Sequence, residues 1–467
     1  MRLKKLELTN FRCFEYLSID LDEQLTVLVA KNGQGKTSVL DAIRIGLWAF
    51  VGGFDLARNP ATDGKNNIGI DDVRIIKVIG REMVRQLPCS VSLQGDVFIS
   101  SGMEEENIKI RTWTRSRKSE AKNTKTIDDF FSKRLMHSAM LAKIQIGSPT
   151  ASNIHLPIFN FFGTKRLCSS QYLTENKKTK SRKQDMDFYM RLFGYRDCLD
   201  PSSSYKHFAD WFTWVFECFR EDQIKQAEKN QLSDTDSVWL NTIKVVQQAT
   251  DVVLQDTGWH SLEYSVSNEK SLILTHDEHG ILKVEMLSDG IRGVLAMVGD
   301  IAYRCIKLNP HLGLNAAKES QGIIMIDEVD MHLHPAWQQT ILGNLTKAFP
   351  KIQFIVTTHS PQVLTTVKPE CIRILSENGE VLTPAINTYG EESKVVLEDI
   401  MQVSSRPHTQ GADLLGDYLK HINQGDIDSP DVIRWRQELE QVFGSDYSQL
   451  KLADMVINKW RAKRGIA

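Results

Sequence analysis

One stretch near the start of the chain, VAKNGQGKTS at residues 29–38, most restricts what this sequence can fold into. The apolar residues LTVLVA (25–30) predict a buried strand before it, and apolar residues at helical spacing in 38–52 predict a helix after it. Between a strand and a helix, successive backbone N–H groups can wrap a phosphate, and glycine permits that tight turn. The predicted phosphate-binding residues are Asn32, Gly33, Gln34, Gly35, Lys36, Thr37 and Ser38.

The side chains of this loop match the chemistry of a nucleoside triphosphate. Lys36 would supply a cation to the β- and γ-phosphate oxygens, and the Thr37 hydroxyl would bind magnesium. The usual pattern G-x-x-x-x-G-K-[ST] begins with glycine, whereas this chain has Ala30 there. Ala30 precedes the residues whose N–H groups surround phosphate, so its methyl group is tolerated if its φ stays negative.

Two acids follow a second apolar strand, GIIMIDEVD at 322–330. Asp327 and Glu328 would lie at the carboxyl end of that strand, where α/β sheets bind ligands. Asp327 would orient magnesium or its water, and Glu328 would position and polarise an attacking water. An acidic turn after a core strand is the alternative, and the phosphate-binding loop favours the catalytic role.

Two shorter segments complete the candidate site. Ser288 and Gly290, in LSDGIRG (287–293), lie at the start of a predicted helix, where Ser288 is either an N-cap only or part of a γ-phosphate clamp. His359, in FIVTTHSP (354–361), follows a core strand that we expect beside the Asp327 strand. A lone histidine there is usually a satisfied polar residue, but the order of the four segments favours a catalytic one.

Composition limits the class of protein. The 467 residues are 41% hydrophobic and 25% charged, with a net charge of -2, so any binding of nucleic acid or membrane must rest on local patches. The seven cysteines are scattered, which predicts reduced thiols. Apolar runs of about 18 residues are absent from the sequence, so we expect a soluble, cytoplasmic protein without membrane contact.

The order of predicted elements suggests four regions. Strands and helices alternate in ways typical of an α/β protein with a mixed β core and an antiparallel β lobe. The first lobe begins with a strand meander at 2–30 and the second contains a helix at 336–350. The regions are an N-terminal lobe (1–164), a helical insertion (165–258), a C-terminal lobe (259–388) and a helical tail (389–467).

The ordered set of loop, LSDG, IDE and histidine resembles the ATP-binding-cassette ATPase superfamily, in its soluble Rad50/RecF/OLD branch. The N-terminal LELTNFRCFEYLSIDL and the post-loop TSVLDAI are also similar to that branch. The resemblance implies an ABC-ATPase head that binds ATP and Mg²⁺. Lys36 and Thr37 would be Walker A, Asp327 and Glu328 Walker B, with the signature at Ser288 and Gly290. It also implies His359 as the switch histidine, a head-to-tail homodimer or higher oligomer, and Asp330 facing the partner subunit.

The tail resembles the PtuA family, the ATPases of Septu and Septu-like retron anti-phage systems, through YGEESKVVLEDIM…SRP (389–407). This implies a separate HNH nuclease partner (PtuB-like) and, in retron versions, a reverse transcriptase with its DNA–RNA product. Trp435 and Trp460 are candidates for partner docking, or they cap the ATPase core. A RecF-like DNA-maintenance ATPase and a nucleotide-binding scaffold with little turnover remain alternatives.

Two basic stretches could contact nucleic acid, or they are solvated loops. Residues 109–134 contain Arg111, Arg115, Arg117, Lys118, Lys122 and Lys125 with Trp113, and residues 165–183 are also lysine-rich. A Q-loop glutamine is missing from PIFNFFGTKR, and Gln94 is a weak substitute. His332 and His334 lack a third nearby ligand, which argues against a metal site.

Overall fold

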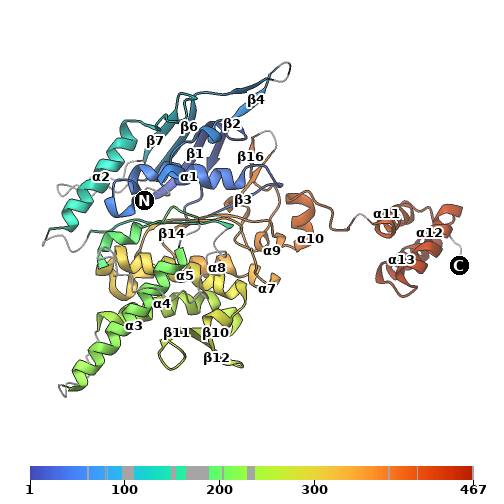
Figure 1. Cartoon of the computed structure of the whole chain (residues 1–467). Coiled ribbons are helices and arrows are strands. Elements are labelled where there is room, and N and C mark those ends of the chain that lie inside the picture. Colours follow the sequence, from blue (N-terminus) through green and yellow to red (C-terminus); the bar gives the residue numbers. More distant parts are fainter. Residues whose placement is uncertain are drawn as a thin grey trace. The chain divides into compact units, whose positions relative to one another are not determined.

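The computed structural model describes residues 1–464 apart from 60–62, 79, 81, 97–109, 149–153, 165–188, 202–203, 229–236, 377–378 and 408. The chain divides into two compact units, Met1–Val396 and Leu397–Ala467 (Figure 1). The first unit contains every residue of the candidate site.

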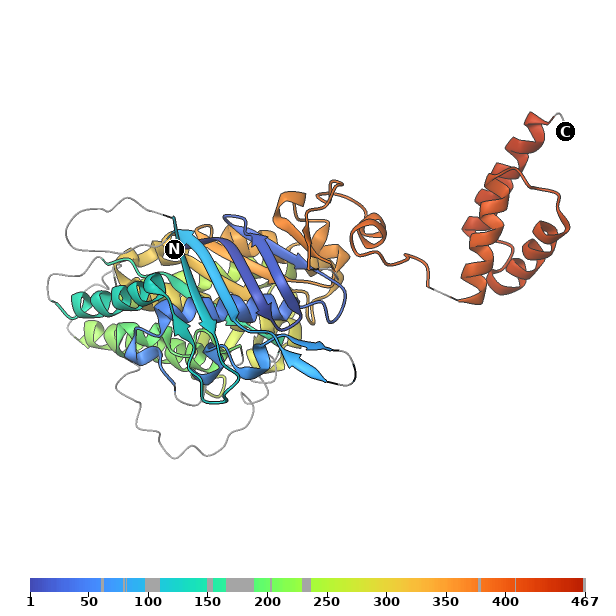
Figure 2. The same ribbon diagram turned by 90° about the horizontal axis from the view of Figure 1, so that it is seen from above.

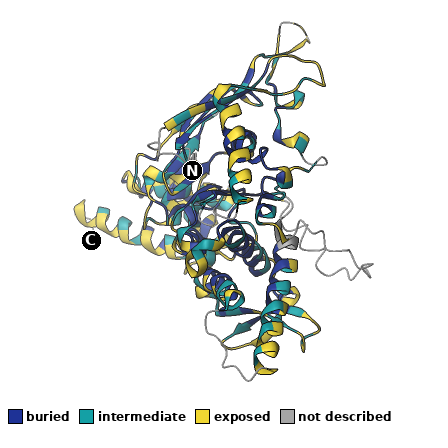
Figure 3. Cartoon of the chain, turned by 90° about the vertical axis from the view of Figure 1, so that its left-hand side faces the viewer, coloured by how far each residue is buried: buried dark blue, intermediate teal, exposed yellow. Residues whose placement is uncertain are grey.

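A mixed sheet forms the centre of the first unit. Six of the described strands pair in the order β16–β15–β3–β14–β13–β9. Their bounds are β3 (Leu25–Val29), β9 (Ile158–Phe162), β13 (Gly322–Ile326), β14 (Ile352–Thr357), β15 (Ile372–Leu375) and β16 (Val381–Leu382). All are parallel except β16. Every residue of β9, β13 and β14 is buried, as expected for parallel strands covered on both faces. Figure 3 shows the buried residues in dark blue.

A second, antiparallel sheet forms the lobe above it. Five of the described strands pair in the order β2–β1–β6–β7–β8. They are β1 (Arg2–Phe11), β2 (Phe14–Asp20), β6 (Cys89–Asp96), β7 (Ile110–Arg117) and β8 (Ile127–Asp128). The α/β class with a mixed core and an antiparallel lobe is confirmed. The meander predicted for 2–30 is wrong in its last strand, because β3 is apolar on both faces and therefore joins the central sheet.

Helix α1 (Lys36–Val51) lies between the two sheets, in contact with β6, β7 and β14 (Figures 1 and 2). Its residues are buried on nearly every side, which explains its broad apolar composition. Gly46 allows the close approach to the antiparallel sheet, since a Cβ there would lie 2.3 Å from Leu93 Cδ1. Helix α2 (Phe130–Ile146) packs beside α1 and β7. The loop before α1 is thus held by a helix clamped between two sheets.

The opposite face of the central sheet carries α5 (Asp289–Leu308), which contacts β9. Helix α4 (Val238–Leu254) packs on α5 and α8 (Ile341–Ala348), and α3 (Ser204–Glu228) packs on α4 and α5. The helices of the predicted insertion therefore cover α5. A three-stranded antiparallel sheet follows, made of β10 (Trp259–Ser265), β11 (Ser271–His276) and β12 (Gly280–Lys283).

The helix predicted at 336–350 is wrong as a single element. It divides into α7 (Pro335–Gln338) and α8, with Thr340 between them at φ -118°. The Thr340 hydroxyl donates to the Trp337 carbonyl oxygen, a local bond that competes with continuous helix. The side chain of Gln338, at the end of α7, bonds to residues outside the helix.

A buried polar group ties α5 to β9. The Asn160 amide on β9 donates to Asp300 on α5, and Arg304 Nε donates to the same carboxylate over 2.9 Å. Arg304 also donates to the carbonyl oxygens of Gly194 and Arg196. Asn160, Asp300 and Arg304 are each 0% exposed, so these bonds satisfy charges that solvent cannot reach.

The second unit is a bundle of α11 (Gln410–Asn423), α12 (Pro430–Phe443) and α13 (Ser448–Lys463). Its own core includes Leu415, Tyr418, Leu439 and Leu450. Trp435 and Trp460 are partly buried against that core, which leaves less of their surface for a partner than the sequence suggested. Their role in docking a partner stays a prediction.

Candidate functional site

The predicted site residues follow the carboxyl ends of neighbouring parallel strands. β14 pairs with β3 through Thr357 and Leu28, and with β13 through Val356 and Ile326. The glycine loop, the Thr358–His359 segment and Asp327–Glu328 therefore leave the same edge of the central sheet. The expectation that the His359 strand lies beside the Asp327 strand is confirmed.

The loop after β3 has the backbone that its glycines predict. Gly33 and Gly35 have φ values of 82° and 90°. A Cβ at Gly35 would lie 2.4 Å from Phe14 Cζ and 2.7 Å from Cys13 Sγ, so both conformation and space require glycine there. The Gln34 side-chain oxygen accepts from the Lys31 N–H over 2.9 Å, which closes the loop. Lys36 and Thr37 begin α1 directly after it.

Lys36 is a buried cation whose ammonium faces backbone carbonyls. Its Nζ donates to the carbonyl oxygens of Ala30 at 2.7 Å and Lys31 at 3.4 Å. Desolvation by burial lowers the pKa of Lys36, while Asp327, Glu328 and Asp330 act in the opposite direction. Neutral acceptors compensate a buried ammonium less well than an anion does. The position is therefore suited to phosphate oxygens.

Thr37 and Asp327 meet across the edge of the sheet. Thr37 Oγ1 donates to Asp327 Oδ2 over 2.9 Å, and Thr357 Oγ1 donates to Asp327 Oδ1 over 2.7 Å. Asp327 is only 3% exposed, and its N–H donates to the Phe162 carbonyl at the end of β9. A hydroxyl beside a carboxylate is the oxygen donor set that Mg²⁺ prefers. These residues fit a magnesium ion bound with a nucleotide.

Glu328 begins a tight turn over residues 328–334. Its φ of 50° is rare for a residue with a side chain, and its N–H donates to Thr357 Oγ1 over 2.8 Å. Thr357 therefore holds both acids at once. Sequence reasoning named neither this residue nor its role, because the contact depends on the register between β13 and β14.

Asp330 lies in the same turn, and its carboxylate points toward the loop after β14. Asp330 Oδ1 accepts from Thr358 Oγ1 over 2.6 Å and from the His359 N–H over 3.4 Å. Within the chain, the Asp330 carboxylate thus bonds to the His359 segment, and the partner-facing role that the resemblance implies stays a prediction. His359 is half-buried beside it.

Ser288 and Gly290 lie at the start of α5, outside the cluster of Lys36, Thr37 and Asp327. Ser288 is the N-cap and accepts from the Ile291 N–H over 3.5 Å. A Cβ at Gly290 would lie 2.5 Å from the His332 carbonyl oxygen, so glycine lets α5 approach the 328–334 turn. The helix starts at Asp289, so Gly290 lies in its first turn.

Arg12 is a second residue that sequence reasoning missed. Its guanidinium bonds to Asp41 at 2.7 Å, to Asp72 at 2.9 Å and to the Ser38 hydroxyl at 3.4 Å. These contacts fix the first turn of α1, where the phosphate-binding loop ends. Arg12 lies in the segment NFRCF, but its bonding partners are 26 to 60 positions away, so a local motif could not reveal this role.

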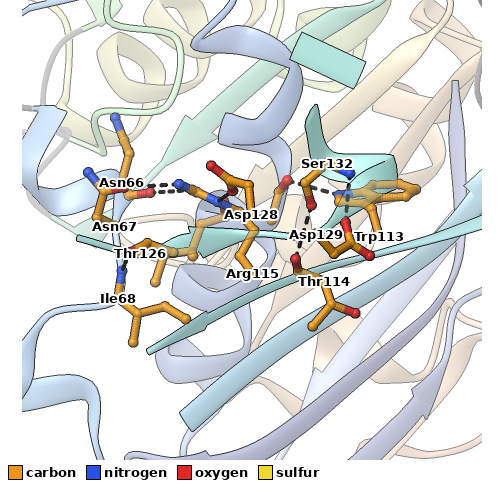
Figure 4. Close-up of polar contacts among 12 residues, drawn as sticks. Asn66, Asn67, Ile68, Trp113, Thr114, Arg115, Thr126, Asp128, Asp129 and Ser132 are labelled. Atoms are coloured by element: carbon orange, nitrogen blue, oxygen red, sulfur yellow. Dashed lines mark hydrogen bonds and ion pairs between the residues drawn. The ribbon is translucent and has the colours of Figure 1, made fainter. Parts of the chain in front are cut away.

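Part of the predicted basic surface at 109–134 is interior. Arg115 and Arg117 are each 2% exposed and Trp113 is 1% exposed. Arg115 donates to the carbonyls of Ile45 and Asn66 and to Asp128, and Trp113 donates to Gly46 (Figure 4). These three side chains brace the antiparallel lobe and cannot contact nucleic acid. Alternating strand β7 simply turns them inward.

The remaining sequence hypotheses have mixed outcomes. Gln94 lies on β6 and donates to Thr112, so the proposed substitute Q-loop glutamine belongs to the antiparallel sheet. The lysine-rich stretch at residues 165–183 lies outside the described residues. The described part of the chain contains no cluster of three or more metal-ligating side chains. Within that part, no helix has the length and apolarity needed to cross a membrane.

Comparison with known proteins identifies relatives. The sequence profile of a family described as AAA domain matches residues 5–248, and a second AAA-domain profile matches residues 207–365. The retron Vc95 probable ATPase of Vibrio cholerae serotype O1 biovar El Tor is 26% identical over 452 residues, covering 89% of this chain and 82% of that protein. The retron Ec83 probable ATPase of Escherichia coli is 28% identical over 505 residues, covering 98% and 87%.

A third relative matches over a shorter range. The Septu protein PtuA of Bacillus mycoides is 42% identical over 98 residues, covering 21% of this chain and 13% of that protein. Among solved structures, the Smc head bound to the C-winged helix domain of ScpA aligns with a TM-score of 0.47 and 14% identity. That alignment covers 83% of this chain and 98% of that one.

Proposed function

Because the chain belongs to the AAA-domain family, we propose that it binds and hydrolyses ATP as the regulatory subunit of an anti-phage defence complex. The relationship to retron ATPases and PtuA confirms the family resemblance inferred from the four motifs. The defence role rests on those relatives. The proposed ATP hydrolysis rests on the side chains at the carboxyl edge of the central sheet.

The observation that carries the ATPase proposal is the 2.9 Å contact between Thr37 and Asp327 beside the buried Lys36. In the proposed site, Lys36 exchanges its carbonyl partners for the β- and γ-phosphate oxygens of ATP. A magnesium ion, when bound, would neutralise phosphate charge, with Thr37 and Asp327 supplying oxygen ligands. The N–H groups of residues 32–38 surround the phosphates.

Glu328 and His359 carry the remaining roles in this proposal. Glu328, one residue beyond Asp327, positions the attacking water and takes its proton. His359 contacts the γ-phosphate from the end of β14. Ser288 and Gly290 lie at the N-terminus of α5, so we assign them to the ATP site of a neighbouring subunit in a head-to-tail dimer.

Turnover by purified protein tests the enzymatic part. Glu328→Gln should lower kcat at least 100-fold while ATP affinity stays within about threefold, because the amide cannot accept the proton. Lys36→Ala should instead weaken ATP binding at least tenfold, through loss of a charge-assisted contact. Equal, negligible turnover in the wild type and Glu328→Gln would favour a nucleotide-binding scaffold.

The proposed partner is a separate HNH nuclease, with a reverse transcriptase and its DNA–RNA product in retron-type systems. The 397–467 unit is the proposed docking segment, since it folds around its own core and leaves Ile433, Val442, Leu452 and Met455 exposed. Co-expression with an adjacent HNH gene, followed by native mass measurement, tests this. Recovery of the complex after deletion of 397–467 would refute the docking role.

Nucleic acid is a further proposed partner, through the exposed Lys118, Lys122 and Lys125. A triple change of these residues to glutamate should weaken salt-dependent DNA binding at least tenfold. The charge-matched control is Lys244, Lys347 and Lys394→Glu, at exposed positions of the same unit. Equal losses in both triples would point to net charge rather than this surface.

A further inference from the structure

The turn over residues 328–334 has a strained backbone and is bonded to side chains outside the turn. Glu328 and His332 have φ values of 50° and 62°, which non-glycine residues adopt rarely. Within the turn, Met331 N–H bonds to the Glu328 carbonyl and Leu333 N–H bonds to the Asp330 carbonyl. Such a conformation persists only where surrounding groups determine it.

Gln338, the last residue of α7, contacts both this turn and the segment after His359. Its Nε2 donates to the Leu333 carbonyl over 2.9 Å and lies 3.4 Å from the Asp330 carbonyl. Its Oε1 accepts from the Ser360 hydroxyl over 2.6 Å. One amide therefore joins the turn after β13 to the loop after β14.

The same turn reaches the start of α5. Gly290 packs against the His332 carbonyl, where a Cβ would lie at 2.5 Å. A contiguous set of contacts thus runs from Ser360, beside His359, through Gln338 and the turn to Gly290. It connects the segment expected to contact a chain's own γ-phosphate with the segment assigned to the neighbouring site.

We propose that Gln338 is a positioning residue that couples the His359 segment to the 328–334 turn and, through it, to the N-terminus of α5. The inference rests on the proposed function. Gln338 contacts none of Lys36, Thr37 or Asp327, so it acts on the geometry of turnover rather than on nucleotide affinity. Without it, Glu328 and Gly290 lose a shared support.

Gln338→Glu is the main test variant, because it keeps the shape and the acceptor toward Ser360 but removes both N–H donors. Gln362→Glu is the matched control. Gln362 Oε1 also lies 3.0 Å from the Ser360 hydroxyl but belongs to α9 (Pro361–Leu364), and its bond to that hydroxyl does not involve the turn. Gln338→Leu serves as a second variant that introduces no charge.

Steady-state kinetics should separate the two glutamines. Both Gln338 variants should lower kcat about threefold to tenfold, the loss expected for one or two backbone-directed hydrogen bonds, with KM for ATP within twofold of wild type. Gln362→Glu should stay within twofold in both parameters. A purely structural role would lower the melting temperature and leave kcat per folded protein unchanged, and that result would overturn the proposal.

Hydrogen exchange supplies a readout that needs no turnover. In nucleotide-free protein, the amides of Met331 and Leu333 should exchange at least threefold faster in Gln338→Glu than in wild type or Gln362→Glu. Unchanged exchange would overturn the proposed support of the turn. Absence of ATP binding and turnover in the wild type would refute the proposed function, whichever way the exchange result falls.

Discussion

At the scale of single residues, the loop after β3 depends on conformations that only some side chains permit. Gly35 combines a φ of 90° with direct contact to Phe14 and Cys13, whereas Gly33 has a φ of 82° and open space around it. The two glycines therefore separate backbone strain from steric crowding. Comparing them isolates what the packing of Phe14 beneath the loop contributes.

Gly35→Ala should destabilise nucleotide-free protein by about 2–4 kcal/mol, since left-handed backbone strain adds to overpacking against Phe14. Gly33→Ala should cost only the strain, about 1–2 kcal/mol. Denaturant unfolding of both variants measures the difference. Equal losses would mean that Phe14 moves aside without cost.

Lys307 on α5 provides a pH-dependent test. Burial lowers its pKa from 10.5 to about 8, so the folded chain releases this proton before the unfolded chain does. The free energy of unfolding should therefore rise with pH between about 8 and 10.5. Lys307→Met should stabilise the protein by about 1–3 kcal/mol at pH 7, and the gain should shrink toward pH 10.

Denaturant melts at pH 7 and pH 10 check this expectation. Lys347→Met, at an exposed position, is the control and should change stability by less than about 0.5 kcal/mol at either pH. A gain for Lys307→Met that is the same at both pH values would assign the effect to packing rather than to the charge.

Local motifs allowed the individual site residues to be placed in the sequence, because glycine, lysine and paired acids have distinct chemistry at short spacing. Thr357 and Arg12 could not be found that way. Thr357 holds Asp327 and Glu328 only because β13 and β14 pair in one register, and Arg12 bonds to residues up to 60 positions away. Side-chain direction misled the sequence reading at Arg115 and Arg117, where strand alternation points basic residues inward.

At the scale of elements, the contact between β9 and α5 is unusual because it is made by buried polar and charged side chains. Asn160, Asp300 and Arg304 form a fully buried polar group between a strand that ends beside Asp327 and the helix that begins at Ser288. The sequence predicted a helix after Ser288. The polar connection between this helix and β9 could not be predicted, since only tertiary packing brings positions 140 residues apart together.

Asp300→Ala should destabilise the protein by about 3–5 kcal/mol, because it leaves the Arg304 guanidinium buried without its carboxylate. The double change Asp300→Leu with Arg304→Met removes both charges and should cost at least about 1 kcal/mol less than the single change. Denaturant unfolding of Asp300→Leu, of Arg304→Met and of the double variant gives the coupling energy. Strictly additive costs would show that the ion pair contributes nothing.

At the scale of the whole molecule, the chain has two units with separate cores. The residues assigned to nucleotide, magnesium and water all precede Val396, while α11, α12 and α13 bury Tyr418, Leu439 and Leu450 among themselves. The sequence indicated a helical tail from residue 389, and the compact unit begins at Leu397. The helical periodicity of the sequence predicts such helices, but it does not predict the residue at which one compact unit ends and the next begins.

Deletion of 397–467 should leave ATP affinity within twofold of the full-length chain, because no residue of the site is removed. Deletion of 448–467 alone should be more harmful, since losing Leu450 and Ala453 exposes the core of α11 and α12. Nucleotide titration and size-exclusion chromatography check the pair. A large loss of affinity in the first deletion would show that the second unit supports the site.

A boundary between two separate cores is a position at which recombination can exchange one unit and leave the core of the other intact. Because every residue of the proposed nucleotide site precedes Leu397, a different helical bundle could be joined at that residue without changing the residues of the site. Related chains could then differ in this bundle while they keep the same proposed nucleotide site. The same boundary offers a defined position for building chimeras.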